Sequence, residues 1–134
     1  MLESYQDKLS ILSELIAFAR VDHTINEDEY DFLLSIANLM KVKKRALDAL
    51  LNNAAQISIP KTELDRIVQF NRLLLLMNID NEQHLKEVAA LHNIGLWMGL
   101  PPSAISQVLE VMHQYPNKVV PPEILLNIFR SQHN

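Results

Sequence analysis

Two acidic pairs with the same internal spacing are the residues of this chain whose types are best suited to chemistry. Asp22 is followed seven residues later by Glu29, and Asp80 is followed seven residues later by Glu87. Carboxylate oxygens are the ligands that hard cations such as calcium and magnesium prefer. Two pseudo-symmetric segments that met in the fold would bring both pairs around one divalent cation. The candidate metal ligands are therefore Asp22, Glu29, Asp80 and Glu87.

The same acids also have a purely structural interpretation. Glu29 and Glu87 fall where helices are expected to begin, and there free backbone amides and the helix dipole favour a carboxylate. Asp80 suits an N-cap position for the same reason. An EF-hand calcium loop is excluded, because the twelfth position counted from Asp22 is Leu33 and not the glutamate that the loop requires. Ion binding and helix capping therefore remain two alternatives for these four residues.

Other side chains that could do chemistry lack a complete site. His84 and Glu87 stand three residues apart on one side of an expected helix, but a transition-metal site needs three or four ligands. The chain has no cysteine, which excludes disulfides and thiolate catalysis. It also lacks a glycine-rich phosphate loop, a G-x-S-x-G elbow and an H-E-x-x-H pair. We therefore expect no catalytic residues, no organic cofactor and no enzymatic activity.

Two further features of the sequence could serve either a binding role or a structural one. The only basic cluster is formed by Lys41, Lys43, Lys44 and Arg45. It could dock an acidic partner, although charges around a helix turn are most often simply solvated. The single tryptophan, Trp97, would suit the centre of an interface, although a place in the core is the commoner explanation.

Length and composition indicate one globular domain of 134 residues, with 49% hydrophobic residues and a formal charge of -4. The acidic balance argues against a nucleic-acid partner, because affinity for phosphate comes mostly from clustered lysine and arginine. The N-terminal segment has neither the basic start nor the apolar stretch of a secretory signal. No apolar run is long enough to cross a bilayer. We therefore expect a cytoplasmic protein that does not insert into membranes.

Helical periodicity predicts an all-α fold of about seven helices. The N-terminus of the second helix is the best specified, because Asn26 and Glu29 have the spacing of a capping box. Leu73 to Leu76 is apolar on every side, which predicts a buried central helix. Gly99 is a natural C-terminal cap for the fifth helix. The expected helices are about 4–20, 26–41, 43–53, 61–77, 81–98, 101–114 and 123–130.

An internal repeat relates the two halves of the chain. A shift of 58 residues places Asp22 on Asp80 and Glu29 on Glu87, and the alignment runs without a gap from Leu15/Leu73 to Leu51/Leu109. The other identical pairs are Leu33/Leu91, Ile36/Ile94, Met40/Met98 and Ala46/Ala104. Because the acids recur in frame with the apolar positions, we infer a pseudo-two-fold duplication of one helix-loop-helix unit, spanning about 11–55 and 69–113.

The segment 16–29, IAFARVDHTINEDE, resembles the motif of the TerB-like domains. These domains occur in tellurite-resistance proteins and at the N-terminus of a DnaJ-type co-chaperone. Their motif has an apolar helix that ends in alanine-aspartate-glycine, a short turn with an isoleucine, and a glutamate that opens the next helix. Here Asp22, Ile25 and Glu29 match it, whereas Val21 replaces the alanine and His23 the glycine.

The resemblance implies a single TerB-like helical domain over 1–134 that binds a protein partner without catalysis and is associated with stress or tellurite resistance. It also implies that the acidic pairs bind a divalent cation of the calcium or magnesium type. The alternative is a purely structural interaction domain, such as a homodimer, in which the acids are only helix caps.

Overall fold

The computed structural model describes residues 3–80 and 85–132, and it is all-helical over that part of the chain. The chain divides into two compact units, unit 1 (Met1–Ile59) and unit 2 (Pro60–Asn134). Seven α-helices lie in the described residues, so the predicted all-α fold of about seven helices is confirmed. The single domain and the pseudo-two-fold relation between the copies stay predictions.

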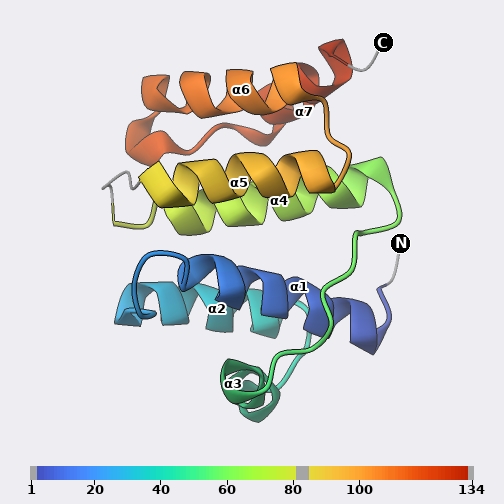
Figure 1. The fold of residues 1–134 in the computed structure, drawn as a ribbon, viewed down its shortest axis with the longest axis vertical. Helices are drawn as coiled ribbons and strands as arrows, with labels where there is room; N and C mark the ends of the chain where they lie inside the picture. Colours follow the sequence, from blue (N-terminus) through green and yellow to red (C-terminus); the bar gives the residue numbers. More distant parts are fainter. Residues whose placement is uncertain (1–2, 81–84, 133–134) are drawn as a thin grey trace. The chain divides into compact units, whose positions relative to one another are not determined.

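Unit 1 consists of three helices, each of which packs against the other two (Figure 1). They are α1 (Tyr5–Ala19), α2 (Glu27–Leu39) and α3 (Lys44–Asn52). Side chains that are almost fully buried line their facing sides and include Leu12, Leu15, Leu33, Ala37 and Leu47. The unit therefore has a core of its own, as the i, i+3, i+4 spacing of its apolar residues predicts.

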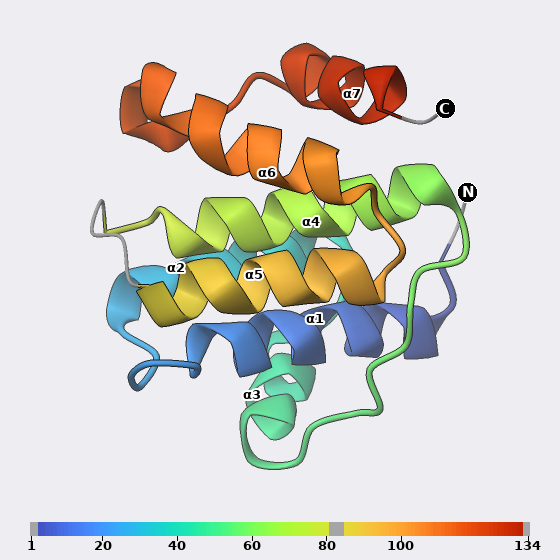
Figure 2. The same cartoon turned by 45° about the horizontal axis from the view of Figure 1, so that its top comes forward.

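Unit 2 consists of four α-helices, in which each helix packs against the next along the chain (Figure 2). They are α4 (Glu63–Met77), α5 (Leu85–Trp97), α6 (Pro102–Val111) and α7 (Pro122–Ser131). Two short 3-10 turns, Met112–Gln114 and Pro116–Lys118, connect α6 to α7. The predicted start of α5 at residue 81 lies outside the described residues.

The bounds of the helices repeat with the same 58-residue shift as the sequence. The shift carries both ends of α1 onto the ends of α4 and both ends of α2 onto the ends of α5. It also carries the start of α3 onto the start of α6. The duplication inferred from residue types is therefore also a repeat of local structure in the two units.

The repeat begins earlier than the sequence alignment predicted. The side chain of Ser4 accepts the backbone N–H of Asp7 at 3.0 Å and so caps α1. The side chain of Thr62 accepts the backbone N–H of Asp65 at 3.1 Å and so caps α4. These caps lie 11 residues before Leu15/Leu73, where the sequence alignment started. Serine and threonine are interchangeable as hydroxyl N-caps, and the residue three positions on is an aspartate in both copies, so the capping chemistry repeats.

The second helix of each unit ends in the same Schellman motif. The Val42 N–H donates to the Ala37 carbonyl at 2.8 Å, and the Leu100 N–H donates to the Gly95 carbonyl at 3.0 Å. The residue before the donor has a left-handed backbone in both copies. It is Lys41 in unit 1, with φ 60°, and Gly99 in unit 2, with φ 81°. The predicted role of Gly99 in ending α5 is thereby confirmed.

We expect Lys41→Gly to raise the free energy of unfolding by about 1 kcal/mol, because a left-handed backbone is strained for an L side chain and not for glycine. The reverse change in the other copy, Gly99→Ala, is expected to lower it by a similar amount. A Cβ at Gly99 would meet nothing within 4 Å, so that loss would come from the backbone alone. Urea denaturation of both variants tests this pair, and equal stability of all three proteins would contradict it.

Burial agrees with the sequence in α4 and differs from it at the tryptophan. Leu73, Leu74 and Leu76 are almost fully buried, as the apolar run predicted. Trp97, for which the core was the favoured place, is 50% exposed at the last position of α5. The periodicity of a helix end does not determine which side faces the core.

Among the helices of the described residues, none combines the length and the apolar character needed to span a bilayer.

Candidate functional site

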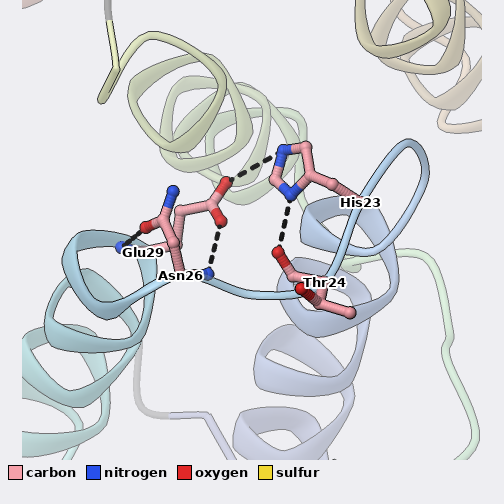
Figure 3. A network of polar contacts seen from close by, with 4 residues as sticks. All are labelled: His23, Thr24, Asn26 and Glu29. Atoms are coloured by element: carbon pink, nitrogen blue, oxygen red, sulfur yellow. Dashed lines mark hydrogen bonds and ion pairs between the residues drawn. The ribbon is translucent and has the colours of Figure 1, made fainter.

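The turn between α1 and α2 holds the first acidic pair and is built by a capping box. The Glu29 N–H donates to the Asn26 side chain at 2.8 Å, and the Glu29 carboxylate accepts the Asn26 N–H at 3.0 Å (Figure 3). The predicted capping box is therefore confirmed. Glu29 is only 3% exposed, which is rare for a glutamate unless its charge is compensated.

His23 contacts the second oxygen of that carboxylate. Its Nδ1 lies 2.7 Å from the Thr24 carbonyl oxygen, and its Nε2 lies 3.6 Å from Oε2 of Glu29 (Figure 3). A carbonyl oxygen only accepts, so Nδ1 carries a proton. In a neutral ring Nε2 would then present a lone pair towards a carboxylate. The geometry thus suits either a protonated imidazole or a cation shared by His23 and Glu29.

Asp22 lies in the same turn but is exposed. It lines an open pocket of about 890 Å³ that is formed by residues 20–27 together with Tyr30 and Leu51. His23 belongs to the same lining, whereas Glu29 does not. The first acidic pair is therefore split between a solvated carboxylate at the pocket and a buried one in the capping box.

The second acidic pair shows the same division between an exposed and a buried carboxylate. Glu87 lies in the first turn of α5 and is 2% exposed, and Asp80 is exposed after the C-terminus of α4. The expected N-cap role of Asp80 and the candidate His84 involve residues 81–84, which lie outside the described residues. The four-acid metal site joins two separate units and stays a prediction.

From its place in the turn, His23 is expected to be an exposed residue without a binding role, but its side chain is only 29% exposed. His23 stands where the TerB-like motif has glycine. Histidine is a common metal ligand. Its presence where the motif has glycine is therefore a sequence signal for a binding role of this turn. Spacing rules did not find His23, because its partner Glu29 lies across the turn and not along one helix face.

A network of polar contacts joins α2 to α3 close to this turn. The Tyr30 hydroxyl donates to Oδ1 of Asp48 at 2.5 Å, and Nζ of Lys44 donates to Oδ2 at 2.9 Å. The Lys44 ammonium also lies 5.6 Å from the centre of the Tyr30 ring. Hydrogen bonds from Tyr30 and then from Lys44 lower the pKa of the Asp48 carboxyl. The hydrogen bond to Asp48 is also the main reason why the pKa of Tyr30 is raised.

We expect Asp48→Asn to lower the stability of the fold at neutral pH, with a loss that disappears in acid. Because the folded-state pKa of Asp48 lies below its ordinary value, its contribution is present above the unfolded-state pKa and is lost as pH falls through the folded-state pKa. Urea midpoints measured from neutral to acid pH test this. The control is Asp31→Asn, at an exposed position of α2, and a pH-independent loss at Asp48 would contradict the link.

Comparisons with known proteins identify no relative of this chain. No protein-family model matches it, and neither the search of curated proteins nor the search of solved structures returned a match. The function proposed below therefore draws on the geometry of the two units and on the resemblance of the turn to the TerB-like motif.

Proposed function

We propose that this chain is a non-enzymatic, TerB-like interaction module that binds a partner protein in a stress or tellurite response. The observation that carries the proposal is an exposed apolar side chain at the same place in both copies of the repeat. Leu39 at the end of α2 is 79% exposed, and Trp97 at the equivalent end of α5 is 50% exposed. The next residues, Met40 and Met98, are buried, so both helix ends are anchored.

Leu39 and Trp97 support the proposal because an exposed apolar side chain recurs at equivalent positions of the two copies. A single exposed apolar residue is ordinary on a protein surface, but exposure of a large apolar side chain at equivalent positions of both copies is not explained by the packing of either helix. Tryptophan in particular is enriched among the residues that dominate binding energy. An isologous contact between two copies of this chain is the main rival, because a dimer would cover the same positions.

Site-specific crosslinking in the native cells tests the proposal. A photoreactive phenylalanine analogue would replace Leu39 or Trp97, and the matched controls are Asp31 and Ala89, an exposed pair that the same 58-residue shift relates. We expect discrete adducts from the first pair and none from the second. Adducts of twice the chain's mass would favour the homodimer, and equal labelling at all four positions would contradict a binding role.

A second candidate function, binding of a divalent cation, is favoured by the ring of His23. A metal-ligating histidine usually donates its other ring N–H to a carbonyl or carboxylate, as Nδ1 does here to Thr24. Nε2 and Glu29 Oε2 would then be the first two ligands. An imidazole in the set suits zinc better than calcium. Of the four predicted acids, Asp22 also lies in this turn of unit 1.

Calorimetric titration of chelator-treated protein with zinc, manganese, magnesium and calcium tests the cation proposal. We expect binding heat and a metal-dependent rise in melting temperature, both lost in His23→Ala. His113→Ala is the matched control, because His113 is exposed in unit 2. Absence of heat and of a melting shift with all four metals would leave His23 and Glu29 as an ion pair within the turn.

A further inference from the structure

The corner between α2 and α3 combines one exposed apolar side chain with several positive charges. We call Leu39, Lys41, Lys43 and Arg45 the basic corner; all four side chains are exposed. Lys44 stands beside them but is engaged by Asp48. No ion pair involves Lys41, Lys43 or Arg45 within the part of the chain that the structure describes. Three exposed cations therefore lie within six residues of Leu39 along the chain, and none of them forms an ion pair within the described residues.

The charges of the basic corner do not help unit 1 to fold. Lys43 is the N-cap residue of α3 and makes no side-chain cap, and the first turn of α3 carries no acid. Cations at a helix N-terminus are unfavourable, because the helix dipole is positive there. By contrast, α1 and α2 both begin with a complete capping box. The dipole of α3 adds to the positive potential of the corner.

The second copy of the repeat shows that the fold does not require these residues. Gly99, Pro101 and Ser103 occupy the positions of Lys41, Lys43 and Arg45. Gly99 relieves the left-handed backbone that Lys41 adopts under strain. Neither α3 nor α6 has a side-chain cap, but unit 1 keeps a left-handed lysine and further cations where unit 2 has neutral residues in the same local structure. Strain retained in this way is typical of functional surfaces.

We propose that the basic corner binds an acidic segment of the partner protein, with an apolar side chain of that segment against Leu39. This inference rests on the proposed function and specifies its partner. Charge complementarity selects the segment, because carboxylates near one apolar residue match three cations that follow one exposed leucine along the chain. The contact is local: salt limits the reach of surface charges to about 8–10 Å.

Two larger anionic partners fit the corner less well. A nucleic acid or a bilayer would also face a chain of net charge -4. One leucine offers little apolar area for insertion into a membrane. A short peptide avoids both costs, because it covers only the corner.

Fluorescence anisotropy with a labelled peptide of glutamates around a central leucine tests the inference. We expect saturable, salt-sensitive binding that is about tenfold weaker in the triple variant Lys41→Gln/Lys43→Gln/Arg45→Gln. The matched control is Lys61→Gln/Lys86→Gln/Arg130→Gln, which removes the same charge from exposed positions of unit 2. A peptide with glutamine in place of glutamate should not bind.

A single substitution separates binding from stability. Lys41→Gly is expected to weaken peptide binding about threefold although it stabilises the fold, an outcome that a merely structural role of Lys41 would not produce. No binding of the acidic peptide, equal binding by both triple variants, or tighter binding to anionic vesicles or to duplex DNA would overturn the inference.

The two proposals can fail separately. If the basic-corner triple variant, with the photoreactive residue at position 39, still forms the native-cell adduct, the protein-binding function stands and the acidic partner is wrong. If position 39 forms no adduct in the unmodified background while Trp97 does, binding occurs at unit 2 and the basic corner again fails. If neither position forms an adduct, both proposals fail together.

Discussion

Gly95→Leu is expected to lower the free energy of unfolding by about 3 kcal/mol, because it forces a side chain into a closed contact. A Cβ at Gly95 would lie 2.6 Å from Cδ1 of Ile105 and 3.3 Å from a ring carbon of Phe70. Gly95 is thus where α5 packs against both α4 and α6. Guanidinium denaturation measures the loss.

Two controls separate overpacking at Gly95 from an effect on helix propensity. Ala89→Leu adds the same kind of side chain at an exposed position of α5 and should change stability by less than about 0.5 kcal/mol. Phe70→Leu in the Gly95→Leu background should recover part of the loss, because unit 1 pairs the smaller Leu12 with Ala37 at these positions. Equal losses in Gly95→Leu and Ala89→Leu would rule out a packing role for Gly95.

Phe129→Ala is expected to lower the free energy of unfolding by about 4 kcal/mol and to make α7 the first helix to unfold locally. The Phe129 ring packs edge-on against Phe70, with ring centroids 5.7 Å apart and planes at 76°. Phe129 is almost fully buried, as are Leu125 and Ile128 on the same face of α7. Its truncation therefore leaves a cavity between α7 and α4 within unit 2.

Hydrogen exchange of the Phe129→Ala variant locates the effect. We expect the amides of α7 to lose protection while those of α1 and α2 keep theirs. The neighbouring change Arg130→Ala, at an exposed position, should leave both stability and exchange nearly unchanged. Loss of protection spread evenly over unit 1 would show that Phe129 does not act locally.

Local rules predicted most of what lies along single helices. The capping box of Asn26 and Glu29, the end of α5 at Gly99 and the apolar face of α4 involve residues within one helix or its ends. Such contacts are read from spacing, because the partners are three or four residues apart. The repeat was also visible, since identical acids and apolar residues recur at one shift.

Side-chain environment depended on contacts between helices and could not be read in this way. Trp97 is exposed although core placement was favoured, and Gly95 is a close-packing position, which its residue type alone does not reveal. His23 lies against Glu29 because the α1–α2 turn folds back, a direction that residue types do not encode.

The acidic pairs separate what the sequence determines from what only the tertiary structure decides. The sequence alone determined that Glu29 opens a helix and that Glu87 stands at the equivalent place, because capping is a short-range property of the backbone. Tertiary structure decided that both glutamates are buried while Asp22 and Asp80 are exposed. Burial depends on which elements pack over a helix start, and it leaves the carboxylate of Glu29 dependent on its contacts with Asn26 and His23 instead of on water.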